Sequence, residues 1–189
     1  MSFPGIGEPG SREGPRPGEH RGTGVTISRM LAAVITCSDR AVSGAYSDRS
    51  GPLLRQALDA LGFETRDPRI VPDNLVMIRA AIREAVASGA RVVLTTGGTG
   101  VGPRDVTVEA TLDLLACELP GIMEAIRRHG AEKTPRALLS RGLAGGVECA
   151  GTRAIIINAP GSEGGASDTI EVAGPLLQHL VEQLDGADH

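Results

Sequence analysis

The chain has 189 residues, a hydrophobic fraction of 41% and a formal net charge of -4, values that suit one globular domain with a sizeable core. The acidic balance argues against broad nucleic-acid binding, which needs a basic surface, and an aromatic fraction of 2% leaves few rings on which bases could stack. Apolar runs are far shorter than a membrane span and no signal leader is recognisable, so we expect a cytoplasmic protein with neither nucleic acid nor membrane among its partners.

Residues 1–29 are rich in glycine, proline and charge and have almost no apolar side chains to bury. Such a segment cannot offset the entropy lost on ordering, so we expect a disordered N-terminal tail followed by one domain over residues 30–186. Cys37, Cys117 and Cys149 are odd in number and widely spaced, which predicts reduced, buried thiols rather than disulfides. The histidines have no ligand spacing, which argues against a histidine metal site.

The first half of the domain is predicted to alternate strands and helices. Residues 31–36 predict a core strand, and residues 51–62 predict a helix with an apolar leucine stripe. Residues 63–71 predict an outer strand interrupted by a proline. Apolar positions at helical spacing predict a second helix over residues 74–86, and the β-branched run in residues 91–96 predicts another buried strand.

The second half continues the same alternation. We expect a helix that begins at residue 106, a helix over residues 120–128, a hairpin or irregular excursion over residues 142–151, a buried strand over residues 154–158 and a final helix. Strands that alternate with helices in this way form mainly parallel sheets with both faces covered. The predicted fold class is therefore α/β, a three-layer αβα sandwich with a mainly parallel central sheet.

A glycine-rich segment, Thr95-Thr96-Gly97-Gly98-Thr99-Gly100, directly follows a buried strand. Glycines let backbone N–H groups come close to an anion and threonine hydroxyls add donors, so this segment predicts a phosphate-binding loop. Arg104, Asp105 and Thr107 follow within a few residues and add a cation, a carboxylate and a hydroxyl. The alternative is a tight turn with no ligand.

Two common nucleotide motifs are excluded. The dinucleotide fingerprint requires a glycine at the position of Pro103, and the P-loop requires a lysine followed by serine or threonine, whereas Lys133 is the one lysine in the chain. A phosphate bound by the glycine segment would therefore be neutralised by arginine, by backbone dipoles or by a metal ion.

Ligands of parallel α/β sheets bind outside the carboxyl ends of the strands. This rule places four segments that are far apart in the sequence on one rim, namely residues 38–40, 71–73, 97–105 and 160–162. Acids, hydroxyls and glycines thereby converge at one edge of the sheet. This convergence is the main functional signal in the sequence.

Several rim residues also have a purely local interpretation. Asp73 and Asp105 both suit the N-cap of the helix that begins after them, where a carboxylate would accept free N–H groups. The remaining local interpretations are a strand cap at Ser38, a local ion pair at Asp39-Arg40 and a simple turn at Pro160-Gly161.

With these segments in order along the chain, the sequence resembles the MogA/MoaB family, the molybdopterin adenylyltransferases of molybdenum cofactor biosynthesis, which are related to the G domain of gephyrin. The resemblance covers residues 30 to about 186, and several motifs in the right order make it specific. These motifs are Ile35-Thr36-Cys37-Ser38-Asp39-Arg40, Asp48-Arg49-Ser50-Gly51-Pro52, Val71-Pro72-Asp73, Thr96-Gly97-Gly98-Thr99-Gly100 with Arg104-Asp105-Val106-Thr107, Leu119-Pro120-Gly121 and Asn158-Ala159-Pro160-Gly161-Ser162.

The resemblance implies that ATP and molybdopterin meet at this rim, that AMP is transferred to the terminal phosphate of molybdopterin and that pyrophosphate is released. Magnesium is the implied ion. Asp73 and Asp105 match the family's two essential acids, and their expected work is to position the metal and the phosphates, because such transfers depend mainly on alignment and charge neutralisation. The residues expected to bind the substrates are Ser38, Asp39, Arg40, Gly97, Gly98, Thr99, Gly100, Arg104, Thr107, Pro160, Gly161 and Ser162.

The resemblance also implies a homotrimer, with a hexamer as the alternative, and a molybdenum-insertion protein as a partner. Ala159 stands where family members often have leucine, a difference that bears on pterin affinity rather than on the fold. Two other classes of function stay open: a non-catalytic pterin-binding or scaffold member, and an unrelated phosphate-binding regulator on a similar sheet. Asp73 and Asp105 favour the enzyme.

Overall fold

The computed structural model describes Met1 and residues 29–186. At its centre lies a sheet of seven strands in the order β2-β1-β4-β7-β6-β5, in which β3 also pairs with β1. The strands are β1 (Leu31–Cys37), β2 (Glu64–Thr65), β3 (Arg69–Val71), β4 (Val92–Thr96), β5 (Leu115–Glu118), β6 (Ala144–Cys149) and β7 (Thr152–Ala159). The expected tail over residues 1–29 falls, apart from Met1 and Arg29, outside the described residues.

The sheet is mainly parallel, as predicted. β1 runs parallel to β2, β3 and β4, and β4 runs parallel to β7. β6 is antiparallel to both β7 and β5, so among the described strands only β6 runs against the rest. The predicted outer strand is divided into β2 and β3, because the proline between them has no N–H to donate to β1.

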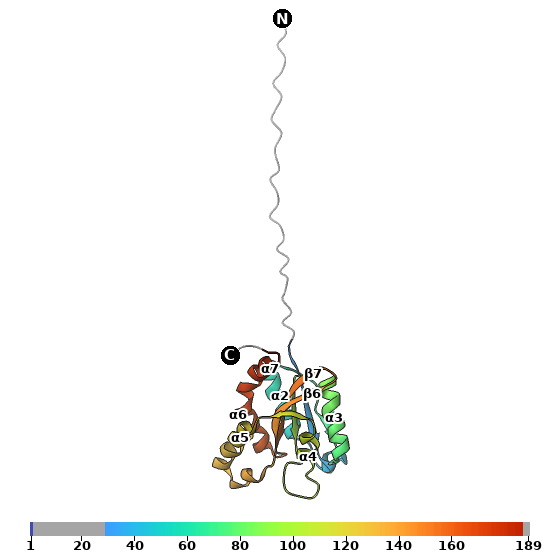
Figure 1. The fold of residues 1–189 in the computed structure, drawn as a ribbon, viewed down its shortest axis with the longest axis vertical. Helices are drawn as coiled ribbons and strands as arrows, with labels where there is room; N and C mark the ends of the chain where they lie inside the picture. Colours follow the sequence, from blue (N-terminus) through green and yellow to red (C-terminus); the bar gives the residue numbers. More distant parts are fainter. Residues whose placement is uncertain (2–28, 187–189) are drawn as a thin grey trace.

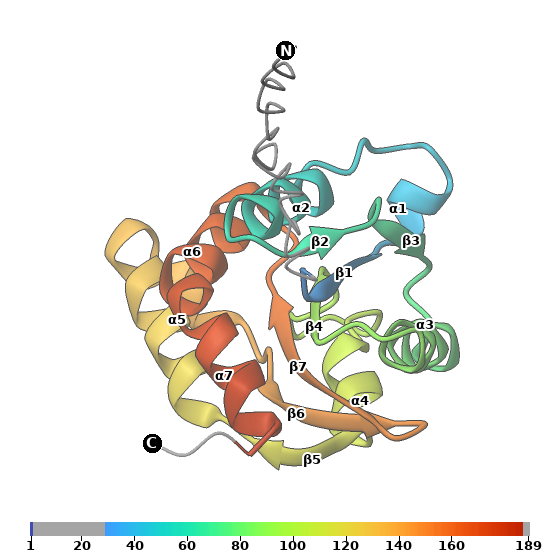
Figure 2. The same cartoon turned by 90° about the horizontal axis from the view of Figure 1, so that it is seen from above.

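Helices cover both faces of the sheet, which confirms the three-layer arrangement (Figure 2). They are α1 (Asp39–Val42), α2 (Ser50–Ala60), α3 (Leu75–Ala87), α4 (Thr107–Leu112), α5 (Pro120–Lys133), α6 (Glu163–Ala173) and α7 (Leu177–Leu184), with short 3-10 turns η1 (Pro135–Leu139) and η2 (Gly174–Leu176). No helix in the described part of the chain is both long enough and apolar enough to cross a membrane.

Strand side chains alternate between two apolar cores. Leu94 and Ile157 pack with α2, α5, α6 and α7 on one face of the sheet, whereas Val93 and Ile156 pack with α3 and α4 on the other. This alternation follows from the period of two in a strand. Because both faces of the central strands are buried, β4 and β7 consist almost entirely of buried residues.

The segment predicted over residues 142–151 as a hairpin or irregular excursion forms strand β6 and the turn of a hairpin whose second strand is β7. Ala150, with φ of 52°, and Gly151, with φ of 80°, form its tight turn, in which two positive φ angles match the twist of the strands. The helix predicted over residues 120–128 extends to Lys133. Figure 1 shows α4, which follows the glycine segment, at the end of the domain opposite α7. That end carries the carboxyl ends of the parallel strands.

Candidate functional site

The ends of β1 and β3 are joined by backbone and side-chain hydrogen bonds. The Ser38 N–H donates to Val71 O at 2.9 Å. The Asp39 N–H donates to Asp73 Oδ2 and the Asp73 N–H donates to Asp39 Oδ1, both at 3.0 Å. The two acidic residues therefore brace each other across 34 positions of sequence, and the rim predicted from the strand ends is confirmed at this point.

The local capping interpretations of Asp73 and Ser38 are resolved by the structure. Asn74, not Asp73, caps α3, since its side-chain oxygen accepts the N–H groups of Val76 and Met77. Ser38 does cap an element, but the element is helix α1: its Oγ accepts the Ala41 N–H at 3.2 Å. Interpreting Asp73 as the cap of α3 is wrong because its carboxylate instead accepts the N–H of Asp39, the first residue of α1.

Two glycines in the segment of residues 95–100, the glycine loop, have backbone conformations that side chains disfavour. Gly97 has φ of 93°, and a Cβ there would lie 2.3 Å from the Cys37 carbonyl oxygen. Gly98 has φ of 64°, and a Cβ there would lie 2.3 Å from Thr107 Oγ1. The absence of a side chain is therefore required for the loop to pack against the ends of β1 and α4.

Asp105 closes this loop from within. Its Oδ2 accepts the Gly102 N–H at 2.8 Å, and the Asp105 N–H donates to Gly102 O at 3.0 Å. Helix α4 begins at Thr107 with Val106 as its N-cap residue and no side-chain cap bond. The interpretation of Asp105 as an N-cap is therefore wrong, because its Oδ2 accepts the Gly102 N–H within the loop and no N–H of α4.

The turn after β7 packs directly against the glycine loop. Thr96 Oγ1 donates to Pro160 O at 2.9 Å, and the Gly97 N–H donates to Ala159 O at 3.2 Å. A Cβ on Gly161 would lie 3.1 Å from Gly97 Cα. The turn at Pro160-Gly161 is therefore joined to the glycine loop by hydrogen bonds and a close backbone contact.

A cavity of about 200 Å³ lies where these strand ends meet, and we call it the carboxylate cavity. It contains three aspartates, Asp48, Asp73 and Asp105. The other residues that line it are Thr36, Cys37, Ser38, Ala41, Tyr46, Ser50, Thr96, Gly97, Gly98 and Gly161. Segments from four strand ends thus converge on one cavity, which is the arrangement expected from the sheet topology.

Asp48 is absent from the predicted site residues although it belongs to a motif of the resemblance. Its Oδ2 accepts a hydrogen bond from Thr36 Oγ1 at 2.6 Å, and its Oδ1 accepts the Gly51 N–H at 2.9 Å. It thereby ties the end of β1 to the start of α2. The signal for it in the sequence was a short acidic and glycine-containing motif shortly after the first strand.

A second cavity of about 450 Å³, the wide cavity, lies on the other side of the same two loops. The predicted residues Thr99, Gly100, Pro160 and Ser162 line it. Three basic side chains also line it, from α5 and η1, and they are Arg127, Lys133 and Arg136. Neither these cations nor Ser140, another residue on its wall, were among the predicted residues, because no motif links α5 and η1 to the rim.

Four predicted binding residues line neither cavity. Thr107 is fully buried behind Gly98, so it supports the loop. Asp39 braces Asp73 and lies 3.9 Å from Arg104 Nη1, which makes that ion pair non-local rather than one with its neighbour Arg40. The guanidinium carbon of Arg40 lies 5.2 Å from the centre of the Tyr46 ring.

Among the cysteines, Cys37 lines the carboxylate cavity. Burial raises the pKa of its thiol to about 12, so the sulfur stays protonated and is a poor nucleophile at neutral pH. The expectation of free thiols is confirmed, since all three cysteines are unpaired. The expectation that all are buried is wrong, because Cys117 is exposed on the edge strand β5.

The carboxylate cavity has oxygen atoms that suit magnesium as ligands. Asp73 and Asp105 each use Oδ2 to accept a backbone N–H, and no described residue donates a hydrogen bond to their Oδ1 atoms. Magnesium prefers oxygen ligands and usually takes one or two carboxylates beside water and phosphate. The donor set therefore fits such an ion.

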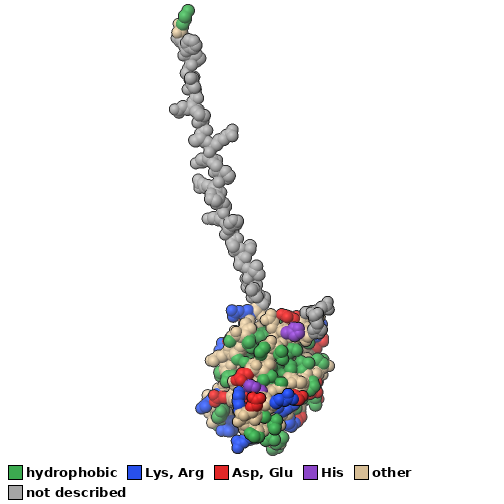
Figure 3. Space-filling view, turned by 90° about the vertical axis from the view of Figure 1, so that its left-hand side faces the viewer, with side chains coloured by type: hydrophobic (Ala, Val, Ile, Leu, Met, Phe, Trp, Pro, Cys, Tyr) green, Lys and Arg blue, Asp and Glu red, His purple; other side chains and the backbone are tan. Residues whose placement is uncertain are grey.

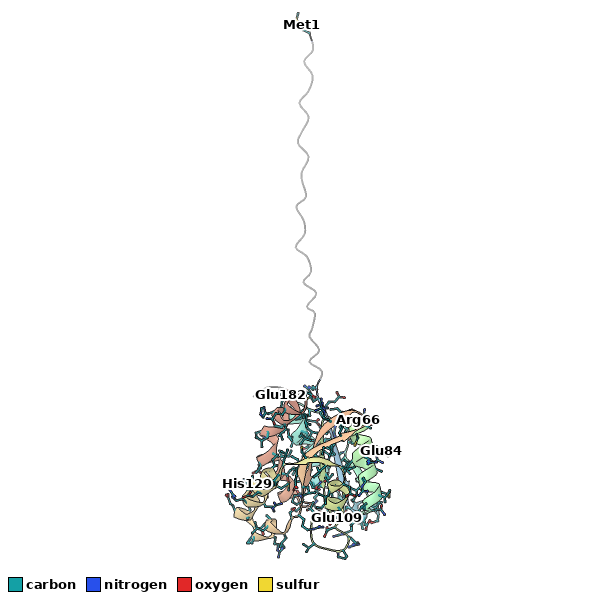
Figure 4. The ribbon with its side chains drawn as sticks, viewed as in Figure 1. Met1, Arg66, Glu84, Glu109, His129 and Glu182 are labelled. Atoms are coloured by element: carbon teal, nitrogen blue, oxygen red, sulfur yellow. The ribbon has the colours of Figure 1, made fainter. Side chains whose placement is uncertain are left out.

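One other acidic cluster lies on α5 and α6, and its member Asp168 lines the wide cavity. Among the described residues, His129, Asp168 and Glu171 form the one group of three metal-ligating side chains whose ligand atoms all lie within 4.8 Å of one another. Figure 3 shows a histidine among acidic and basic side chains on this side of the domain, and Figure 4 places His129 over α5. Lys133 Nζ lies 2.6 Å from Asp168 Oδ1 and 3.3 Å from Glu171 Oε2, so an ammonium group already pairs with both carboxylates of this cluster.

Comparison with known proteins identifies the family of the chain. Residues 33–179 match the family described as "Probable molybdopterin binding domain". A molybdenum cofactor biosynthesis protein B of Staphylococcus aureus is 36% identical over 173 residues, which cover 88% of this chain and 98% of that protein. The chain belongs to the MogA/MoaB family.

Other relatives of this MogA/MoaB member support the assignment. A molybdenum cofactor biosynthesis bifunctional protein of Synechococcus elongatus is 41% identical over 163 residues, 86% of this chain, but the match spans only 50% of that relative's length. The structure of the molybdopterin biosynthesis Mog protein from Mycobacterium ulcerans superposes with a TM-score of 0.75 at 36% identity, covering 82% of this chain and 99% of the other. The predicted fold class and family are thereby confirmed.

Proposed function

We propose that this protein is a molybdopterin adenylyltransferase that transfers AMP from ATP to the terminal phosphate of molybdopterin and releases pyrophosphate. The observation that carries the proposal is the pair of cavities on either side of the glycine loop and the turn at residues 159–162. Two substrates bound in adjoining cavities would present their phosphates to one another across the same backbone surface.

The two cavities differ in chemistry. The carboxylate cavity combines Asp48, Asp73 and Asp105 with the loop backbone and suits the nucleotide phosphates together with a metal ion. The wide cavity combines basic side chains with Ser162 and apolar walls, and its volume of about 450 Å³ is in the usual range for small-molecule sites. We assign molybdopterin to the wide cavity, with its phosphate near Ser162.

The transfer itself needs no covalent enzyme intermediate. An oxygen of the pterin phosphate attacks the α-phosphorus of ATP, the bond from that phosphorus to the bridging oxygen breaks, and pyrophosphate leaves. A magnesium ion held by Asp73 and Asp105 would neutralise phosphate charge. The backbone of Gly97 and Gly98 lets the phosphates approach closely, and the protonated thiol of Cys37 takes no part as a nucleophile.

The test is to incubate the protein with ATP, magnesium and molybdopterin and to measure pyrophosphate. Release that depends on both molybdopterin and magnesium, and that falls in Asp105→Asn, would support the proposal. Binding of molybdopterin without pyrophosphate release would identify a non-catalytic member, and no binding would point to a different phosphate ligand. Asp59→Asn, which changes an exposed acid of α2 paired with Arg55, is the matched control.

We also propose that the protein assembles as a homotrimer. The support is the family resemblance together with exposed apolar side chains such as Val101, 76% exposed, and Leu139, 61% exposed, since large exposed apolar groups favour association. Light scattering at micromolar concentration tests this. A monomer would refute it, and a hexamer would indicate the alternative assembly.

A further inference from the structure

Arg141 makes an unusual set of contacts with the glycine loop. It lies between η1 and β6, 36 residues from Asp105 in sequence. Its Nε donates to Gly100 O at 2.7 Å, its Nη2 donates to Asp105 O at 2.9 Å, and its backbone N–H donates to Thr99 O at 2.8 Å. One residue therefore holds three carbonyl groups of the loop that carries Asp105.

A carboxylate orients this guanidinium. Arg141 Nη1 donates to Glu109 Oε1 at 2.6 Å, and Glu109 lies on α4, at the end of the domain opposite Glu182 (Figure 4). The hydrogen bond from Arg141 lowers the pKa of Glu109, so the pair remains ionised at neutral pH. The planar guanidinium fork suits several fixed acceptors at once, which a lysine ammonium cannot match.

The same short segment also reaches the wide cavity. Ser140, the residue before Arg141, lines that cavity, and its Oγ donates to Thr99 Oγ1 at 3.2 Å. The loop lies between the two cavities, because Gly97 and Gly98 line one while Thr99 and Gly100 line the other. A displacement of the loop would therefore shift the two cavities relative to each other.

We propose that Arg141, oriented by Glu109, is a positioning residue that fixes the glycine loop and the Asp105 carboxylate for phosphate transfer. The inference rests on the proposed adenylyl transfer and adds to it two residues that touch neither substrate cavity. Transfers of this kind depend on alignment, and a misplacement of about 1 Å can cost about a hundredfold in rate. Loss of the hydrogen bonds from the Arg141 guanidinium should thus reduce kcat more than it reduces substrate affinity.

The test compares Arg141→Gln, Arg141→Lys and Glu109→Gln with a matched control at the other end of β4. Arg91 there makes a similar fork, with Nε donating to Arg153 O at 2.8 Å and Nη2 to Asp185 Oδ1 at 2.6 Å. Arg91→Gln and Asp185→Asn remove comparable hydrogen bonds far from the cavities. Glu109→Gln is the milder variant and keeps the test usable if Arg141→Gln does not fold.

Two readouts are measured. In the pyrophosphate-release assay, Arg141→Gln should lower kcat by about tenfold or more with little change in the KM for ATP. Arg141→Lys should lower kcat to a similar extent, because a lysine cannot replace the guanidinium hydrogen bonds. In hydrogen exchange, amides in residues 97–105 should exchange about tenfold faster or more in Arg141→Gln, because hydrogen bonds from a charged group have been lost. The Arg91 and Asp185 variants should leave kcat and this loop unchanged.

Unchanged exchange in residues 97–105, or equal losses of kcat in the Arg141 and Arg91 variants, would overturn the inference. A kcat of Arg141→Lys equal to that of the wild type would also overturn the inference, since a positive charge without the guanidinium hydrogen bonds would then be enough to position the loop. If the wild-type protein releases no pyrophosphate, the proposed function fails, whereas the exchange measurement still decides whether Arg141 holds the loop.

Discussion

Asp39 and Asp73 are linked by two reciprocal hydrogen bonds, in which the backbone N–H of each residue donates to a carboxylate oxygen of the other at 3.0 Å. This exchange fixes the segments after β1 and β3 side by side. It also leaves Oδ1 of Asp73 without a hydrogen bond from any described residue, at the wall of the carboxylate cavity. The Asp73 side chain thereby has a structural role through Oδ2 and is placed for a chemical role through Oδ1.

The first prediction separates these two parts of Asp73. Asp73→Ala should lower the free energy of unfolding by about 1–3 kcal/mol, because the Asp39 N–H loses its acceptor. Asp73→Asn keeps an oxygen acceptor and should cost about 1 kcal/mol or less. Both variants should lose pyrophosphate release, since the negative charge at the cavity is gone. Urea unfolding and the transfer assay measure the two effects.

The control for this prediction is a variant of Asn74, the neighbouring residue that caps α3. Asn74→Ala removes the α3 N-cap and should cost about 1 kcal/mol with normal turnover per folded molecule. Normal turnover in Asp73→Asn would contradict a role for this carboxylate in the reaction.

The second prediction concerns Asp105→Asn. The amide oxygen can still accept the Gly102 N–H, so the free energy of unfolding should fall by about 1 kcal/mol or less. Turnover should fall by about a hundredfold or more, because the negative charge at the phosphates is lost. Thermal unfolding and pyrophosphate release test the two effects separately. A variant that melts far lower yet turns over normally when folded would show that Asp105 only closes the loop.

The third prediction compares two glycines with positive φ. Gly44→Ala should cost about 1–2 kcal/mol, since φ is 72° but nothing lies within 4 Å of the added Cβ. Gly97→Ala should cost about 3 kcal/mol or more, because the same strain is joined by a contact of 2.3 Å with the Cys37 carbonyl oxygen. Urea unfolding of the two variants gives the difference, and equal losses would show that the loop moves aside.

The fourth prediction concerns how the contribution of Glu171 to stability changes at acid pH. His129, Ser167 and Lys133 lower the pKa of Glu171 from 4.5 to about 2 in the folded protein. The ionised carboxylate therefore stabilises the folded state fully above about pH 4.5, and this contribution disappears as the pH falls toward 2. The stability difference between wild type and Glu171→Gln should shrink over that window. Urea midpoints measured from pH 2 to 6 test it, and a constant difference would contradict it.

Much of the fold followed from local pattern. The helix over residues 74–86 was predictable because its apolar side chains recur at helical spacing and pack on one core. The division of the outer strand at Pro68 was anticipated because proline cannot donate to the sheet. The extension of α5 to Lys133 was missed, since its last turn is polar and is held by α6 through Asp168.

The sequence by itself determined most of the alternation of strands and helices, although neither the short helix α1 nor the edge strand β5 was predicted. Through the rule that ligands bind at the carboxyl ends of parallel strands, it also determined the rim on which Asp73, Asp105 and the glycine loop meet. Only the tertiary structure decided where those carboxylates point. Asp105 turns to Gly102 rather than capping α4, Asp48 enters the cavity, and Arg141 fastens the loop from 36 residues away in sequence. Spacing along the chain encodes local periodicity, whereas these hydrogen bonds depend on loops that are positioned only once the two cores have packed.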